Sequence, residues 1–275
     1  MIVMSTQRIP LGLEVPTGEA VSLPMHHVIV TGVTRLAGKT TTIEAMLSRL
    51  PANYSALVFR TKRGEVDFHG SHRVEPYFRP MLNSVGEVDW EYVQSLLEAA
   101  MGERLKFERS WIIRSARGAH SLREVYENIK RELERSQKRG RGLDESVYTN
   151  LSAYFEKILP QLEEYPFADR LTLGTNLGSG NHVMELGHLS KEVQALVISS
   201  CLQEVQGHRI KTVVVIPEAW EFLPQARGNP VKWAAQRVIR QGGASGNFLW
   251  LDSQDVTTVT KDVLKSVGVW LMGRQ

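Results

Sequence analysis

The sequence has a single cysteine, Cys201, in 275 residues, and it has no long apolar run. One cysteine excludes a disulfide within the chain, which is the usual support of small secreted domains. No apolar run approaches the ~18 residues that a membrane-spanning helix needs. The first residues also lack the basic start and long apolar centre of a secretory signal. We therefore expect a cytoplasmic protein without membrane association, and Cys201, in an apolar helical pattern, as a core thiol.

A strong net charge is also lacking, since the chain carries only +3 at neutral pH. The charge is unevenly spread, however, because residues 101–143 hold twelve Lys or Arg against six Glu. A stripe of this kind is able to follow a phosphate backbone. The alternative is a solvated helical surface with ion pairs four residues apart, such as Glu127 with Arg131 and Glu134 with Lys138. Both interpretations are kept. The basic residues are Arg104, Lys106, Arg109, Arg114, Arg117, Arg123, Lys130, Arg131, Arg135, Lys138, Arg139 and Arg141.

Several apolar runs are continuous rather than alternating, and helix-like segments separate them. Continuous runs are typical of strands that are buried on both faces of a parallel sheet. The sequence therefore predicts an α/β fold with a mainly parallel sheet covered by helices. The runs are 28–30, 56–59, 213–216, 248–251 and 267–272, and a further strand is expected at 182–186, followed by Ser190 as an N-cap and a helix over 191–205.

The pattern also predicts how the chain is divided. Residues 1–25 contain a hairpin around Pro16-Thr17-Gly18, which we expect to pack against the edge of the sheet. Residues 88–166 have a helical period that a polar, glycine-containing loop interrupts at 136–142. We interpret this segment as a helical subdomain inserted into an α/β core that is formed by residues 26–87 and 167–275.

The clearest motif is a glycine-bounded loop, Gly32-Val33-Thr34-Arg35-Leu36-Ala37-Gly38-Lys39-Thr40, between an apolar run and a helix-like stretch. A strand, a glycine-rich turn, Gly-Lys-Thr and then a helix form the context of a phosphate-binding loop. In such a loop, backbone N–H groups and a helix N-terminus favour a polyphosphate. The residues expected to bind the nucleotide are Gly32, Thr34, Ala37, Gly38, Lys39, Thr40 and Thr41.

Two of these side chains have specific expected roles. Lys39 is predicted to reach the β- and γ-phosphates of ATP, and Thr40 to offer its hydroxyl to Mg²⁺. The spacing is irregular, because five residues separate the two glycines where four are usual, and Val33 stands where the first glycine is expected. The alternative is an ordinary strand-to-helix turn with an exposed lysine.

A second apolar strand ends in an acidic residue, as a nucleotide hydrolase requires. The run 212–216 leads into Pro217-Glu218, and Glu218 is placed where it can polarise an attacking water. The Asp that usually precedes this Glu and helps to hold Mg²⁺ is replaced by Pro217, which cannot bind a metal. Mg²⁺ is then expected to rest on Thr40, the phosphates and water. A structural role for Glu218, capping the strand end, is the alternative.

The next apolar strand ends in Asp252-Ser253-Gln254-Asp255. A polar residue at this strand end is expected to lie between Lys39 and Glu218. We assign to Gln254 the role of orienting water or of reporting the loss of phosphate. Asp252 is either the carboxylate that compensates for Pro217 at the metal or, like Asp255, a cap or turn residue.

Four segments in this order resemble the HerA–FtsK superfamily of DNA-pumping ATPases. They are His27-Val28-Ile29-Val30-Thr31-Gly32, Thr61-Lys62-Arg63-Gly64-Glu65, Pro217-Glu218-Ala219-Trp220-Glu221-Phe222 and Asp252-Ser253-Gln254. Met184-Glu185-Leu186, which leads into Ser190-Lys191-Glu192-Val193-Gln194, is similar to HerA-type proteins. The resemblance covers residues 26–68 and 181–275 and leaves out the basic helical segment.

This resemblance implies a RecA-like P-loop NTPase core, a ring that is usually a hexamer with ATP between subunits, and duplex DNA as the translocated polymer. It also implies that an arginine from the neighbouring subunit stabilises the transferring phosphoryl group. Arg237, Arg240 and Arg274 are the candidates, and we assign the role to Arg240. The family often has Gly-Arg before the sensor strand, whereas this chain has Arg240-Gln241-Gly242-Gly243.

The leading hypothesis is an ATPase of the HerA/FtsK type that translocates, processes or packages DNA. In it, Lys39, Glu218, Gln254 and Arg240 carry hydrolysis, and a nuclease or another effector is a possible partner. The alternative is a nucleotide-gated scaffold or switch subunit, which hydrolyses ATP weakly and assembles with partner proteins. Pro217, the lengthened loop and the missing Gly-Arg favour this alternative. The sequence does not separate a packaging or conjugation motor from one of DNA repair or defence.

Overall fold

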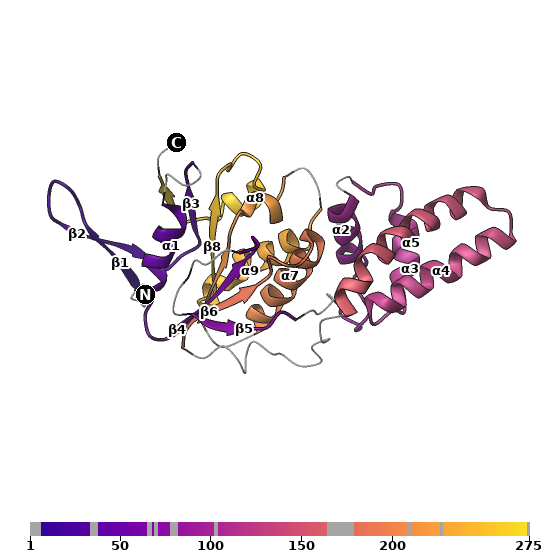
Figure 1. The fold of residues 1–275 in the computed structure, drawn as a ribbon, viewed down its shortest axis with the longest axis horizontal. Coiled ribbons are helices and arrows are strands. Elements are labelled where there is room, and N and C mark those ends of the chain that lie inside the picture. Colours follow the sequence, from indigo (N-terminus) through magenta and orange to yellow (C-terminus); the bar gives the residue numbers. More distant parts are fainter. Residues whose placement is uncertain are drawn as a thin grey trace.

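The computed structural model describes residues 7–33, 38–64, 68, 71–77, 82–101, 104–163, 179–207, 211–225 and 228–273. Its centre is a seven-stranded sheet with the order β5-β6-β4-β7-β8-β3-β9 (Figure 1). Every neighbouring pair in this sheet is parallel, which confirms the predicted mainly parallel sheet. The strands are β3 (Val28–Thr31), β4 (Tyr54–Arg60), β5 (His72–Val74), β6 (Gly180–Glu185), β7 (Lys211–Ile216), β8 (Phe248–Ser253) and β9 (Val269–Met272).

The continuous apolar runs form these strands because both faces of the sheet are covered. Successive side chains of a strand point to opposite faces. In β8, Phe248 and Trp250 join one hydrophobic cluster, and Leu249 and Leu251 join the other. The first cluster packs against α1 (Lys39–Leu47), and the second packs against α7 (Lys191–Gly207) and α9 (Pro230–Ser245). The short edge strand β5 was not predicted from the sequence.

The predicted N-terminal hairpin is present. Strands β1 (Arg8–Leu13) and β2 (Ala20–Pro24) form a separate antiparallel sheet and do not pair with the edge of the large one. Ile9 is buried in the cluster that contains Ile43 and Met46 of α1. Arg49, just after α1, donates a hydrogen bond to the carbonyl oxygen of Leu11 at 2.5 Å. The hairpin therefore contacts the first helix, and its cluster also contains Val269 of the edge strand β9.

The described part of residues 88–166 is helical. It consists of α2 (Trp90–Met101), α3 (Arg109–Ala116), α4 (Leu122–Lys138) and α5 (Gly142–Glu163). Helix α2 contacts α7 and α9, so this part shares a hydrophobic core with the sheet. Helices α4 and α5 form a hairpin that projects away from the sheet, at the end of the molecule opposite to β1 and β2 (Figure 1). The division into an α/β core and an insertion stays our proposal.

The turn between α4 and α5 confirms the predicted break at the polar, glycine-containing loop. Gly140 has a φ of 62°, which a residue with a side chain rarely adopts. At the other end of α4, the hydroxyl of Ser121 accepts a hydrogen bond from the N–H of Glu124 and caps the helix. Among the described helices, none is long and apolar enough to cross a membrane.

Candidate functional site

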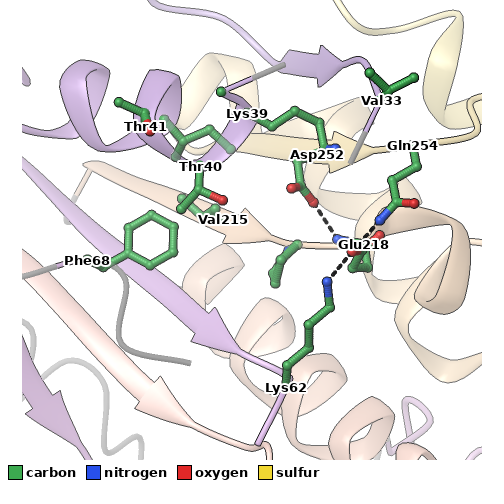
Figure 2. A pocket seen from close by; sticks show the side chains of 13 residues that line it. Val33, Lys39, Thr40, Thr41, Lys62, Phe68, Val215, Glu218, Asp252 and Gln254 are labelled. Carbon is green, nitrogen blue, oxygen red and sulfur yellow. Dashed lines mark hydrogen bonds and ion pairs between the residues drawn. The ribbon is translucent and has the colours of Figure 1, made fainter. Parts of the chain in front are cut away.

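Three neighbouring strands bring the predicted site residues to one edge of the sheet. Strand β8 lies between β3 and β7. Because the strands are parallel, the segments that follow them meet at the same edge. There they line a cavity of about 420 Å³ that includes Lys39, Glu218 and Gln254 (Figure 2). Gln254 directly follows β8, and β8 lies between β3 and β7, which lead to Lys39 and Glu218. The predicted position of Gln254 between Lys39 and Glu218 is thereby confirmed.

The phosphate loop enters α1 through a left-handed glycine. Gly38 has φ 61° and ψ 30°, and no side chain caps the helix that follows it. The first N–H groups of a helix have no partner within the helix, so this end of α1 is suited to an anion. The side chain of Lys39 is buried, and its Nζ donates to the carbonyl oxygen of Gly32 at 2.9 Å. Gly38, Thr40 and Thr41 line the cavity, whereas Thr34 and Ala37 lie outside the described residues.

Glu218 is held by its backbone and by three side-chain donors. Its φ of 48° lies in the left-handed region, which is costly for a residue with a side chain. Its Oε1 receives Nζ of Lys62 in an ion pair and Nε2 of Gln254 at 2.9 Å. Its Oε2 receives Nε1 of Trp220 at 2.8 Å. Burial alone raises the pKa of this carboxyl, but the bonds from Lys62, Trp220 and Gln254 outweigh it and lower the pKa. Glu218 is therefore ionised and fixed in place.

Asp252 holds the backbone of Glu218. Its Oδ1 accepts a hydrogen bond from the backbone N–H of Glu218. Burial raises the pKa of Asp252 to about 6, and the nearby charge of Glu218 adds to this, while the same N–H and the ammonium groups of Lys39 and Lys62 oppose it. The turn role belongs instead to Asp255, which accepts the N–H of Thr257 at 2.8 Å. Asp252 thus lies in the cavity wall, where a carboxylate that compensates for Pro217 was expected.

Of the arginine candidates, the two that the structure describes do not line this cavity. Arg237 and Arg240 are exposed on α9. Arg240 follows Ile239, which lines a different cavity together with His26 and Tyr54 at the beginnings of the strands. Arg240 is therefore near the opposite edge of the sheet, so within one chain it does not reach Lys39 or Glu218. Arg274 lies outside the described residues.

Sequence reasoning missed two partners of Glu218. Lys62 follows β4, which pairs with β7, and Trp220 lies in the short helix α8 (Ala219–Phe222) directly after Glu218. Both occur in segments that carry the family resemblance, but no role was assigned to them. The pairing of β4 with β7 would have pointed to Lys62. Strand order, however, is not readable from the apolar pattern alone.

The residues present fit a nucleotide with Mg²⁺. Two ammonium groups and an uncapped helix N-terminus line one cavity, whose volume is in the range of ligand pockets. Within the described ranges there is no group of three or more His, Cys, Asp or Glu that could hold a metal by itself. Mg²⁺ usually takes few protein ligands and keeps waters and phosphates. Thr40, with Asp252 nearby in the wall, is a sufficient protein contribution.

No family model matches this sequence, and no curated protein matches it. Two solved structures are similar in fold. VirB4 of Thermoanaerobacter pseudethanolicus has a TM-score of 0.66 at 13% identity, over 97% of this chain and 84% of that one. The bacterial conjugative coupling protein TrwBdeltaN70, in complex with sulphate, has a TM-score of 0.58 at 13% identity, over 97% of this chain and 75% of that one. The chain thus has the α/β fold of P-loop NTPases that the sequence predicted.

Proposed function

We propose that the protein is an ATP-hydrolysing motor of the FtsK/HerA type that acts on DNA as a ring-shaped oligomer. One observation carries the proposal. A lysine at the start of the first core helix, a glutamate after β7 and a glutamine after β8 line the same cavity. These three positions correspond to phosphate binding, water activation and phosphate sensing in nucleotide hydrolases. The narrower resemblance to HerA stays a prediction, because the two structural likenesses support the fold alone.

The binding roles follow from the position of each group. Gly38 supplies a turn that lets backbone N–H groups approach the phosphates, and Lys39 exchanges its bond to the Gly32 carbonyl for phosphate oxygens. Thr40 is the residue that would hold Mg²⁺, which neutralises phosphate charge when it is bound. Gly32, Thr34, Ala37 and Thr41 are assigned to the same loop on the basis of the motif.

The hydrolytic roles belong to Glu218 and Gln254. Of the two described carboxylates that line the cavity, Glu218 has the lowered pKa, so at neutral pH it is ionised and able to accept a proton from water. The amide of Gln254 is 2.9 Å from Oε1 of Glu218, so a water held by both side chains has a fixed orientation. Asp252 and the left-handed backbone at Glu218 hold the base in position.

Arg240, which is exposed on α9, supports the proposal of a ring. A residue that acts on the nucleotide of a neighbouring subunit does not have to line its own cavity. Arg240 fits this condition, since it is exposed and lies near the opposite edge of the sheet. We assign it as the arginine that completes the site across a subunit boundary.

DNA is proposed as the polymer because of the helical hairpin. In the described residues, the expected ion pairs of Glu127 with Arg131 and of Glu134 with Lys138 are not formed, although Arg135 pairs with Glu132. The hairpin tip, which we define as residues 135–141, carries four basic residues and no acidic one. Lys138 and Arg139 are exposed there. Such a tip is suited to contact phosphates of a nucleic acid.

The experiment is ATP turnover of the parent protein with and without duplex DNA. Stimulation by DNA is expected of the motor. Replacing Lys138 and Arg139 together by Ala should lower DNA affinity about tenfold and reduce the salt slope of binding by about two, since each lost phosphate contact removes about one. The charge-matched control replaces Lys261 and Lys265 together by Ala. Both lysines are exposed, Lys261 at the start of α10 (Lys261–Leu264) and Lys265 directly after it. Equal DNA binding by the tip variant would exclude the tip as the contact.

One observation favours the second candidate, a nucleotide-gated scaffold with slow turnover. Both oxygens of Glu218 are already occupied by donors, and Pro217 lines the cavity in place of a metal-binding Asp. MgATP binding without measurable turnover, with or without DNA, would support the scaffold and reject the motor. Conjugation, repair, defence and packaging all stay open, and the name of TrwB, a conjugative coupling protein, favours testing conjugation first. A co-purified nuclease or effector would point to one of these processes.

A further inference from the structure

Lys62 is a second ammonium group in the cavity proposed for ATP, and it comes from a different element than Lys39. It extends from the end of β4 to Glu218, whereas Lys39 comes from α1 (Figure 2). Its side chain is 52% exposed, while that of its partner Glu218 is only 7% exposed. The ion pair therefore joins a half-exposed side chain to a buried one.

The backbone next to Lys62 is held by two close contacts. The amide of Gln194 is buried and donates to the carbonyl oxygen of Thr61 at 3.2 Å. Gly187 approaches the Lys62 peptide so closely that a Cβ at position 187 would lie 2.4 Å from the Lys62 carbonyl carbon. The long side chain of Lys62 thus extends into the cavity from a backbone that is held in place.

Oε1 of Glu218 has no acceptor position left for water while Lys62 and Gln254 stay in place. Oε1 receives Lys62 and Gln254, and Oε2 receives Trp220. A general base has to form a hydrogen bond with the water that it deprotonates. Lys62 or Gln254 therefore has to leave before Oε1 can bind this water, so a ligand that draws one of them away makes Oε1 available.

Lys62 is the donor that a triphosphate would attract. Trp220 and Gln254 are neutral, so a phosphate group has little charge attraction for them. An ammonium group on a flexible four-carbon stem is strongly attracted to phosphate oxygens. Lys39 is already assigned to the phosphate loop, so Lys62 is the remaining described ammonium group that lines the cavity.

We propose that Lys62 senses the terminal phosphate by exchanging between two acceptors, the Glu218 carboxylate and the γ-phosphate of bound ATP. When it binds the γ-phosphate, it frees Oε1 of Glu218 for water. The release of the base is then coupled to the presence of a triphosphate rather than a diphosphate. This inference rests on the proposed function, because it requires ATP in the cavity.

The test compares the affinity of the full chain for ADP and for the non-hydrolysable analogue adenylyl imidodiphosphate, both with Mg²⁺, by calorimetry. The parent protein should bind the analogue at least about tenfold more tightly than ADP, and Lys62→Ala should lose about tenfold of this ratio. Lys62→Arg keeps the charge and should retain most of the ratio. A purely structural ion pair would leave the ratio unchanged, since both nucleotides would meet the same Glu218.

Lys191→Ala is the matched control. Lys191 also forms an ion pair, with Glu221, and its side chain is also 52% exposed, but it does not line the ATP cavity. It should keep the parent ratio, and thermal unfolding of each variant verifies that it is folded. If Lys62→Ala unfolds, Lys62→Met, which keeps the length of the stem, replaces it. A parent that binds neither nucleotide would overturn the proposed function, whereas a parent that discriminates while Lys62→Ala or Lys62→Met discriminates equally would overturn only the role of Lys62.

Discussion

The seven-stranded sheet buries an ionisable side chain at each end of its strands, and we call these two ends its edges. The two side chains are held in different ways. At the edge where the strands begin, Nδ1 of His27 accepts a hydrogen bond from the backbone N–H of Leu249 at 3.0 Å. At the edge where the strands end, Glu218 is bound by three side chains, of which Lys62 is half exposed. The backbone of Glu218 is left-handed, whereas His27 directly precedes a regular strand.

The kind of partner, backbone or side chain, distinguishes a structural ionisable group from a functional one. A backbone partner is fixed by the sheet, so His27 cannot change its bond without opening a strand pair. Burial and the charge of His26 lower the pKa of His27 to about 4, so it is neutral at physiological pH. Side-chain partners are exchangeable, and backbone strain at such a position is typical of active sites. The comparison thus supports our proposal that the chemistry takes place at the Glu218 edge and that the His27 edge belongs to the framework.

The largest expected effect is that of Glu218→Gln on ATP turnover. An amide cannot accept the proton of water, so turnover should fall about 100- to 1000-fold, within the range of a general base. MgATP affinity should change less than about threefold, because the shape of the side chain is kept. Glu221→Gln makes the same chemical change three residues later at a position that does not line the cavity, and it should hydrolyse ATP as the parent does. Unchanged turnover in Glu218→Gln would end the distinction between the edges.

A smaller effect is expected for His27 on stability in acid. Its pKa falls from an ordinary 6.5 to about 4, so the stability that neutral His27 contributes is complete above pH 6.5 and is lost as the pH falls through 4. Between pH 7 and 4 the parent should lose about 2–3 kcal/mol more unfolding free energy than His27→Asn, which keeps a short acceptor but does not titrate. Urea unfolding at both pH values measures this. Parallel losses in the two proteins would show that His27 is not buried in its neutral form.

Asp252 at the other edge should respond to pH in the opposite direction. Its pKa rises from an ordinary 3.8 to about 6, so its contribution to stability is complete below pH 4 and is lost as the pH rises through 6. Asp252→Asn removes the buried charge and should gain about 2 kcal/mol over the parent between pH 4 and 7. The same unfolding series, performed without Mg²⁺, measures the gain. A stability difference that is independent of pH would contradict the buried carboxylate.

Much of the fold could be predicted because the apolar runs record burial on both faces. The runs at 28–30 and 248–251 became β3 and β8, and the helix expected at 191–205 became α7. Strand β5 could not be predicted in this way, because His72 and Arg73 of this short edge strand are exposed and leave no apolar run. The hairpin was predicted from its turn residues, but the apolar pattern does not show that Ile9 shares a cluster with Ile43 on α1.

The site was predictable only where a motif fixes a local geometry. Gly38 and Lys39 follow from the strand-turn-helix order, and Gln254 follows from its place after an apolar strand. Lys62 and Trp220 were missed because their contacts with Glu218 depend on the pairing of β4 with β7 and on the turn into α8. The roles of Arg240 and of the loop residues Thr34 and Ala37 stay predictions.

The most direct test of the account is calorimetry of MgATP binding to the parent, to Lys39→Ala and to Lys211→Ala. Lys211 begins β7 at the opposite edge, where its Nζ lies 5.5 Å from the centre of the Tyr54 ring. The account predicts that the parent binds MgATP, that Lys39→Ala binds it about 100-fold more weakly, and that Lys211→Ala binds it as the parent does. No binding by the parent, or equal binding by Lys39→Ala, would contradict the account.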